Sequence, residues 1–296
     1  MEQNRLRAFI SLTRPANLPT AMADILAGFT MAGAVDAASF GSRWLSFDLV
    51  LLLMSSICLY AGGVVLNDYF DRDTDAIERP ERPIPSGTVS PGEAFTLAII
   101  LLIAGVLLAF GVNYLAGFLS FLLFVAIWAY DSRTKHSSFW GPLNMGICRG
   151  LNLLLGASIF GSLNSWWLAF IPIVYIGAIT LISQGEVKGG NKNNIILAGV
   201  FYTVVISALL FLVFQSGSFD ALPYLLLFSV FIMLPLIKAF KNNTPDNIKR
   251  AVKAGVISLI VLDACIAAGL TVWWFGLIIL ALLPLSLVLS RQFAVT

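Results

Sequence analysis

The chain has 296 residues, of which 58% are hydrophobic and only 11% are charged, and its mean hydropathy is +0.89. A composition so poor in charge excludes an ordinary soluble domain and indicates a polytopic membrane protein. The net charge of +2 says little by itself, and we expect no nucleic-acid partner. The single histidine, His136, and three cysteines at unrelated spacings argue against histidine-rich metal sites and disulfides.

The apolar segments are long enough to predict membrane spans, each of which needs about 20 mainly apolar residues. The predicted spans are 17–35, 48–66, 93–111, 113–130, 143–161, 165–183, 194–214, 221–240 and 252–270. The last apolar stretch, 272–290, is either a tenth span or lies partly in the membrane interface, where the Trp273–Trp274 pair would fit. The sequence therefore predicts an all-α membrane protein that forms one domain over residues 1–296.

Basic residues are distributed unevenly between the connections. Apart from Arg43 and Arg291, every one of the 18 Lys and Arg residues falls at the N-terminus, or in or beside the connections after the second, fourth, sixth and eighth spans. These places share one side of the membrane, which the positive-inside rule makes cytoplasmic. We therefore expect a multi-pass protein of a bacterial-type inner or plasma membrane. Its N-terminus and the acidic stretch described next would lie on the cytoplasmic side.

Residues 67–75, at the end of the second span, read Asn-Asp-Tyr-Phe-Asp-Arg-Asp-Thr-Asp. On a helix, where each residue turns by about 100°, Asp73 points away from the other polar side chains. Those others share an arc of about 100°: Asn67, Asp68, Asp71 and Asp75. Neighbouring carboxylates repel each other unless a cation lies between them. Oxygen ligands of this kind suit Mg²⁺, which often also binds substrate phosphates.

An Arg-Pro pair follows twice in the same connection, at Arg79-Pro80 and Arg82-Pro83. The prolines end the helix and stiffen the turn, and arginine offers planar, multidentate contacts to phosphate oxygens. Acids, a metal ion and arginines together are typical of a diphosphate site. The alternative is a solvated loop held by salt bridges.

Two later connections carry further polar candidates. Arg149 lies inside an apolar run, where a charge needs an anion or a carboxylate, so it binds a diphosphate or pairs with Asp131. Residues 182–194 contain one acid, Glu186, which with Gln184 and Asn191 could ligate a single cation weakly. Lys188 and Lys192, in the same stretch, could bind phosphate as point charges. The alternative there is a polar, Gly-rich loop without a ligand.

Asp24 and Asp263 are acids inside predicted spans. Each either faces a cavity or pairs with a neighbouring polar group, because an ionisable residue within a membrane is expensive without a partner. Aromatic walls would favour a carbocation, and four aromatic side chains lie near the basic connections: Tyr69, Phe70, Trp128 and Tyr130.

The Asn-Asp-x-x-Asp-x-x-x-Asp pattern over 67–75, followed by Arg-Pro-x-Arg-Pro-Ile-Pro-Ser-Gly over 79–87, resembles the first aspartate-rich motif of the UbiA superfamily of intramembrane prenyltransferases. The Thr-Arg-Pro-Ala-Asn stretch 13–17 is similar to the usual start of that family's first helix, and the resemblance covers nearly the whole chain. Residues 141–152 resemble the EboC-like branch of the superfamily.

The resemblance implies a bundle of nine helices around a central cavity, in which Mg²⁺ bridges two acidic motifs and an isoprenoid diphosphate. Ionisation would give an allylic cation that an aromatic or lipid-like acceptor captures. The implied metal ligands are Asn67, Asp68, Asp71, Asp75 and Glu186. The implied catalytic residues are Asp68, Asp71, Glu186 and Lys188. The implied substrate-binding residues are Asn17, Arg79, Arg82, Lys135, Arg149 and Lys192.

The sequence departs from the family at two places. The family usually has a second aspartate-rich motif after its sixth helix, where this chain has only Glu186 as an acid. The family also often has a Lys four residues after a Tyr, whereas Lys135 follows Tyr130 by five.

Two functions remain as alternatives to a Mg²⁺-dependent prenyltransferase acting on an isoprenoid diphosphate and a hydrophobic or aromatic acceptor. A non-catalytic carrier or binder of a lipid or metabolite would fit the single acid of the second stretch. A cation transporter would need acids near the middle of the bilayer, whereas acids 68–75 lie at a helix end.

Overall fold

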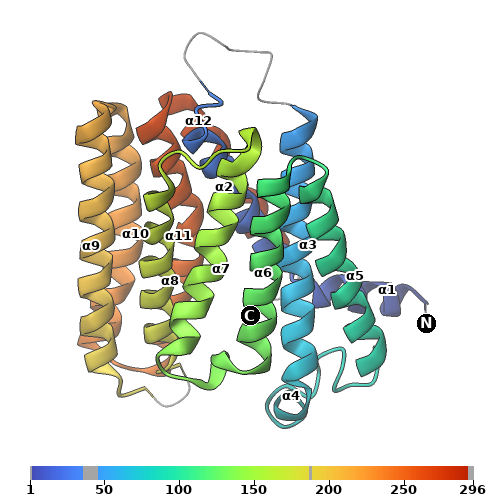
Figure 1. Ribbon diagram of the computed structural model, residues 1–296. Coiled ribbons are helices and arrows are strands. Elements are labelled where there is room, and N and C mark those ends of the chain that lie inside the picture. The colour runs from blue at the N-terminus through green and yellow to red at the C-terminus, as the bar shows by residue number, and fades with distance from the viewer. Residues whose placement is uncertain (1, 36–45, 187–188, 293–296) are drawn as a thin grey trace.

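The computed structural model describes residues 2–35, 46–186 and 189–292, and this part of the chain is helical without a strand. Long helices run roughly side by side in a bundle, and α1 leaves its side near one end (Figure 1). The helices longer than 14 residues are α3 (Phe47–Phe70), α5 (Pro91–Phe110), α6 (Tyr114–Ser132), α7 (Trp140–Ala157), α9 (Lys192–Ser216), α10 (Leu222–Lys241) and α11 (Pro245–Leu270). The helices of 14 residues or fewer are α1 (Glu2–Leu12), α2 (Leu18–Met31), α4 (Arg72–Glu78), α8 (Phe170–Ser183), α12 (Trp273–Leu280) and α13 (Leu282–Gln292).

Within the described residues, nine segments are long and apolar enough to cross a membrane. The predicted all-α, multi-pass membrane fold is therefore confirmed. The nine segments of the structure differ from the nine predicted spans at both ends of the chain. The first predicted span forms α2, whose 14 residues extend about 21 Å, less than the hydrocarbon core of about 30 Å. The stretch 273–292 is among the nine and is interrupted at Ala281, between α12 and α13.

Polar side chains fix where several of the long helices begin. Ser46 caps α3 by accepting from the Leu49 amide at 3.2 Å, and Asn113 caps α6 by accepting from the Ala116 amide at 2.9 Å. Ser90 and Glu93 form a reciprocal capping box at the start of α5. Each cap satisfies backbone N–H groups that have no partner within the helix, which is especially important beside a membrane.

Small residues let the helices approach closely, as is usual in membrane bundles. A Cβ on Gly28 of α2 would lie 2.2 Å from the Leu153 carbonyl oxygen, and one on Gly156 of α7 would lie 2.4 Å from the Ile25 carbonyl oxygen. The backbones of α2 and α7 are therefore in direct contact. This contact matters for the site, because it brings the polar side chains of α2 against those of α7.

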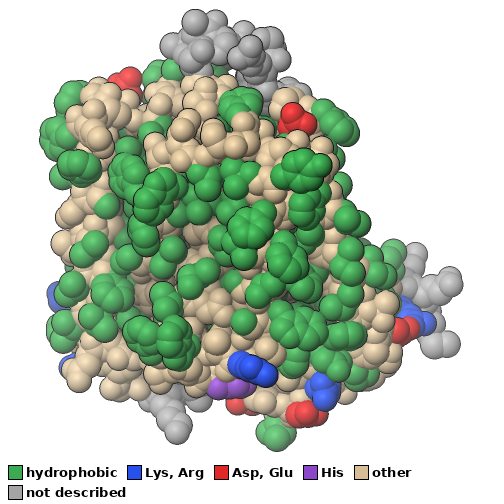
Figure 2. Space-filling view, in the orientation of Figure 1, with side chains coloured by type: hydrophobic (Ala, Val, Ile, Leu, Met, Phe, Trp, Pro, Cys, Tyr) green, Lys and Arg blue, Asp and Glu red, His purple; other side chains and the backbone are tan. Residues whose placement is uncertain are grey.

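Hydrophobic side chains cover the sides of the bundle, while Lys, Arg, Asp, Glu and His side chains gather towards the end that carries α4 (Figure 2). Large apolar side chains such as Leu107, Phe211 and Leu226 are more than half exposed, as expected for a surface that faces lipid. We call the charged end the basic end. It consists of α4 and the connections α4–α5, α6–α7, α8–α9 and α10–α11.

Candidate active site

A cavity of about 420 Å³ lies inside the bundle, surrounded by α2, α3, α6, α7, α8 and α11. Its wall is mostly apolar, with side chains such as Leu59, Ile127 and Val256. Its polar lining comprises Arg14, Asn17, Thr20, Ser56, Tyr60, Asn67, Tyr130, Asp131, Arg149, Asn152, Thr180, Ser183 and Lys253. Two of the predicted substrate-binding residues, Asn17 and Arg149, therefore face this cavity.

The acidic motif lies at the junction of α3 and α4. Asp71 stands between the two helices, but the helical hydrogen-bond pattern continues through it: its amide donates to the Asn67 carbonyl oxygen at 2.9 Å, and the Asp75 amide donates to the Asp71 carbonyl oxygen at 2.8 Å. The carboxylates therefore keep their helical spacing across the junction. Asp68 and Asp75 are buried, whereas the side chain of Asp73 is 88% exposed.

Basic side chains hold the three inward carboxylates of the motif. Arg82 bridges two of them, with its Nη1 at 2.6 Å from Asp75 Oδ2 and 3.3 Å from Asp68 Oδ1. Lys135, from the α6–α7 connection, contacts Asp71 Oδ1. The structure thus brings five predicted site residues into one cluster, and each of them takes part in one of these contacts: Asp68, Asp71, Asp75, Arg82 and Lys135.

Arg14 is a member of this cluster that the sequence interpretation did not include in the site. Its Nη2 donates to Asp68 Oδ1 at 2.6 Å, and its side chain is only 19% exposed. The stretch that carries it precedes α2 and is held by Ser286 of α13, whose hydroxyl donates to the Ala16 carbonyl oxygen at 2.7 Å. The sequence did contain an indication that Arg14 belongs to the site, because Arg14 lies in the stretch 13–17 that resembles the family.

The predicted metal site has the right donors but is not assembled as a ligand cage. Among the described residues, no group of three or more His, Cys, Asp or Glu side chains is arranged to hold a metal ion. The physical reason is that Arg14, Arg82 and Lys135 contact the carboxylate oxygens that a cation would otherwise bind. Carboxylates beside an amide remain a donor set suited to Mg²⁺.

Asn67 and Asp131 connect the motif to α6. The Asn67 amide donates to Asp131 Oδ1 at 2.9 Å, which leaves the Asn67 side-chain oxygen available as a ligand. Asp131 is 3% exposed and lines the cavity. The alternative that Arg149 pairs with Asp131 is therefore wrong, because the partner of Asp131 is Asn67.

Arg149 instead pairs with Asp24, deep in the bundle. Arg149 Nε lies 2.9 Å from Asp24 Oδ2, and its Nη2 donates to the Thr20 carbonyl oxygen at 2.7 Å. Asn152 also donates to Asp24 Oδ2, at 2.8 Å, and Asp263 is fully buried beside that acid. The close approach of α2 and α7 thus pairs Arg149 with Asp24, as the cost of an intramembrane charge requires. Neither carboxylate oxygen of Asp263 has a hydrogen-bond partner among the described residues.

The α8–α9 connection is a weaker polar site than the acidic motif. Glu186 is half-buried, and burial raises its pKa, while the positive charges of Lys249 and Arg79 act in the opposite direction. Asn191 is committed elsewhere, because its amide donates to the Ile182 carbonyl oxygen at 3.0 Å. The predicted site residue Lys188 lies outside the described residues.

Two further predicted substrate-binding residues lie outside the cluster. Arg79 is exposed. The Lys192 ammonium lies 5.9 Å from the ring centroid of Phe240 on α10, and the Lys192 side chain is exposed.

The aromatic side chains near the basic end divide into two groups. Tyr130 lines the cavity. Tyr69, Phe70 and Trp128 instead belong to an aromatic cluster with Phe95, with ring centroids 5.0 Å apart for Tyr69 and Phe95 and 6.1 Å apart for Phe70 and Trp128. Of the four aromatic candidates in the sequence, Tyr130 is the one placed to meet a substrate in this cavity.

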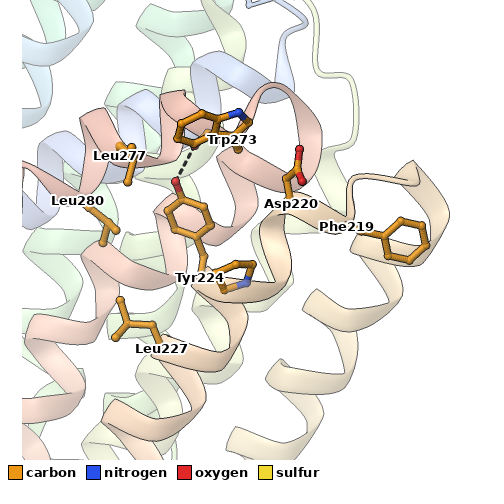
Figure 3. A pocket seen from close by; sticks show the side chains of 8 residues that line it. Phe219, Asp220, Tyr224, Leu227, Trp273, Leu277 and Leu280 are labelled. Carbon is orange, nitrogen blue, oxygen red and sulfur yellow. Dashed lines mark hydrogen bonds between the residues drawn. The ribbon is translucent and has the colours of Figure 1, made fainter.

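A second pocket, of about 460 Å³, lies between the start of α10 and α12 (Figure 3). Its wall is apolar except for Asp220 and the Tyr224 hydroxyl, and that hydroxyl donates to the Trp273 carbonyl oxygen at 2.6 Å. No residue of the acidic motif or of the α8–α9 connection lines this second pocket. The central cavity is therefore the candidate active site.

The bundle and its cavity together define a class of protein. It is a multi-pass membrane protein in which an apolar cavity opens beside a cluster of carboxylates, arginines and a lysine. Such an arrangement suits an intramembrane enzyme whose substrate combines an apolar chain with a strongly anionic group.

The chain belongs to the UbiA prenyltransferase family, whose model matches residues 26–259. It is a membrane prenyltransferase, as the resemblance of the acidic motif predicted. The resemblance to the EboC-like branch remains a prediction.

Relatives with assigned names are similar over large parts of the chain. A digeranylgeranylglyceryl phosphate synthase from Sulfurisphaera tokodaii is 25% identical over 78% of this chain and 84% of its own length. The enzyme of the same name from Ignicoccus hospitalis is 32% identical over 62% of this chain, which spans 59% of that relative's length.

Solved structures share the fold. A UbiA homolog from Archaeoglobus fulgidus, bound to GPP and Mg²⁺, superposes with a TM-score of 0.68 at 16% identity, covering 93% of this chain and 99% of the other. A structure of a digeranylgeranylglyceryl phosphate synthase gives a TM-score of 0.65 at 20% identity, covering 91% of this chain and 99% of the other.

Proposed function

We propose that this protein transfers a prenyl group from an isoprenoid diphosphate to a lipid-like acceptor, with Mg²⁺ bound at the acidic motif. The observation that supports this proposal is the cluster of Asp68, Asp71 and Asp75 beside an apolar cavity, each carboxylate facing a basic side chain. The acceptor is a prenylated glyceryl phosphate, in line with the names of the relatives.

When the substrate binds, the carboxylates would contact the metal ion in place of their basic partners, and the basic side chains would contact the diphosphate. Asn67, Asp68, Asp71 and Asp75 would hold Mg²⁺, with Glu186 as a further ligand from the α8–α9 connection. When bound there, Mg²⁺ would supply positive charge against the negative charge of the departing diphosphate. Arg14, Arg82 and Lys135, no longer needed by the carboxylates, would contact phosphate oxygens as charge-assisted donors.

The apolar wall serves the prenyl chain. Leu59, Ile127 and Val256 line the cavity, and they would bury the isoprenoid and exclude water from the reacting carbon. Tyr130, at the same cavity, offers an aromatic face to developing positive charge.

The orientation follows from the distribution of the basic side chains. The basic end would face the cytoplasm by the positive-inside rule, so the diphosphate would enter from the aqueous cytoplasmic side. The membrane would be a bacterial-type inner or plasma membrane, with the N-terminus on the cytoplasmic side.

The test is a transfer assay with the purified protein in lipid nanodiscs. Geranylgeranyl diphosphate and a prenylated glyceryl phosphate are supplied with Mg²⁺ or with EDTA, and the doubly prenylated product is measured by mass spectrometry. The proposal expects product with Mg²⁺ and none with EDTA. Tight binding of the prenylated compounds without any product would instead support a carrier.

A further inference from the structure

The basic side chains of the site differ in whether an acidic side chain contacts them. Arg14, Arg82, Lys135 and Arg149 each contact an acidic side chain. Lys253 of α11 lines the same cavity, but within the described residues no ion pair or hydrogen bond of its side chain is found. It is exposed, so its ammonium is free to meet an anion that enters the cavity.

Lys253 lies on a different wall of the cavity from the acidic motif. Val252, Val256 and Leu259 of α11 line the cavity with it, whereas the motif follows α3. Helix α11 packs against α2, α8, α9, α10 and α12, and α3 packs against α2, α5, α6 and α7. The two helices stand apart in the bundle, with α7 and α6 between them in Figure 1. Lys253 therefore adds a positive charge that is separate from the motif's cluster.

The part of the wall formed by α8 and α11 is mostly apolar, carries two hydroxyls beside Lys253, and has no acidic side chain in its lining. Thr180 and Ser183, near the end of α8, line the cavity beside α11. Their hydroxyls donate to backbone carbonyl oxygens, of Ile176 at 2.9 Å and of Thr180 at 2.8 Å. An unpaired ammonium on such a wall attracts anions and favours a compact phosphate group, which lysine binds as a point charge.

A prenyl transfer of the proposed kind brings two anionic groups to one cavity. The diphosphate is the more highly charged, and the motif offers it a metal ion and three basic side chains. A phosphate on the acceptor would be repelled by the diphosphate, and it gains from a cation on another wall.

We propose that Lys253 binds the phosphate monoester of the prenyl acceptor and selects for acceptors that carry it. The proposal rests on the proposed prenyl transfer and adds the residue that distinguishes a phosphorylated acceptor from a neutral one. The diphosphate binds at the α3–α4 junction, and the acceptor phosphate binds at α11.

The test compares two acceptors in nanodiscs of phosphatidylcholine: a prenylated glyceryl phosphate and the same prenylated glycerol without its phosphate. For Lys253→Ala, we expect KM for the phosphorylated acceptor to rise about tenfold or more, since a hydrogen bond to a charged group is lost. KM for the isoprenoid diphosphate, and KM for the neutral acceptor, should stay within about twofold of the wild-type values.

Two variants serve as controls. Lys253→Arg keeps the charge and should retain most of the preference for the phosphorylated acceptor. Lys241→Ala removes the same charge from an exposed site on α10, outside the cavity lining, and should leave every KM unchanged.

Equal effects of Lys253→Ala on both acceptors, or a rise in KM for the isoprenoid diphosphate alone, would overturn the inference and leave the proposed function intact. An effect that appears only when phosphatidylglycerol is added would assign Lys253 to a lipid headgroup and also overturn it. Absence of transfer by the wild-type protein to either acceptor would overturn the proposed function and this inference with it.

Discussion

Two connections at the basic end invite comparison: residues 67–87, after α3, and residues 183–194, after α8. In the first, three carboxylates contact Arg14, Arg82 and Lys135, and Arg82 bridges two of them. In the second, a single carboxylate, that of Glu186, is half-buried beside amides that bond to one another or to the backbone. Of the two connections, the first therefore concentrates the negative charge, as the proposed metal site requires.

The largest effect is expected when one charge is removed from the first connection. Asp71→Asn should lower kcat/KM for prenyl transfer by about 10³-fold, because a ligand for the metal that neutralises the leaving group is lost. Asp73→Asn is the matched control, since it makes the same change in the same motif on an exposed side chain. Steady-state kinetics at saturating Mg²⁺ measures both, and equal losses in the two variants would contradict the account.

The next largest effect concerns the arginine that bridges the motif. Arg82→Ala should lower kcat/KM by about 10²-fold, because a donor to the departing diphosphate is lost. It should also lower the thermal stability in EDTA, since Asp68 and Asp75 are then left with less positive charge around them while still buried. Arg79→Ala, at an exposed arginine of the same connection, is the comparison for both measurements. An equally large loss of thermal stability in Arg79→Ala would show that the bridge of Arg82 contributes no more to stability than an exposed arginine does.

A smaller effect is expected at the second connection. Glu186→Gln should weaken the apparent affinity for Mg²⁺ in the transfer assay by about tenfold and leave kcat nearly unchanged, because one ligand of several is replaced by an amide. A loss as large as that of Asp71→Asn would show that both connections contribute equally. The difference between the two would then lie only in the number of acids.

The smallest effect is expected at Lys192, which the sequence interpretation placed among the substrate-binding residues. Lys192→Ala should change kcat/KM less than about twofold, because an exposed ammonium near a ring contributes little, and this one lies beside Phe240 on α10. A decrease in kcat/KM of fivefold or more, measured with the same substrates, would show that Lys192 contributes to substrate binding.

The long helices were predictable because a membrane leaves the backbone little choice. Polar backbone groups in lipid must bond within their own helix, so apolar length alone locates spans such as α5 and α9. The first predicted span, 17–35, is longer than the helix that forms there, because α2 ends at Met31 and Gly33 follows it with a φ of 72°. Hydropathy reports the composition of a segment and does not say at which residues its helix begins and ends.

The acidic motif was predictable for a similar reason, since helical spacing places Asp68 and Asp75 near one face. The partners of the buried charges were harder to predict. Arg14 is 54 positions from Asp68, and the pair of Arg149 and Asp24 depends on the contact between α2 and α7, which Gly28 and Gly156 allow. Such pairs are determined by which helices touch, and a single sequence does not state that.

The first connection, residues 67–87, is proposed to bind an isoprenoid diphosphate through Mg²⁺. The most direct measurement is the thermal stability of the purified protein with geranyl, farnesyl or geranylgeranyl diphosphate, in Mg²⁺ and in EDTA, for the wild-type protein and for Asp71→Asn. The account predicts that at least one diphosphate stabilises the wild-type protein in Mg²⁺ only, and that Asp71→Asn abolishes this gain. The same stabilisation in EDTA, or its survival in Asp71→Asn, would contradict the claim.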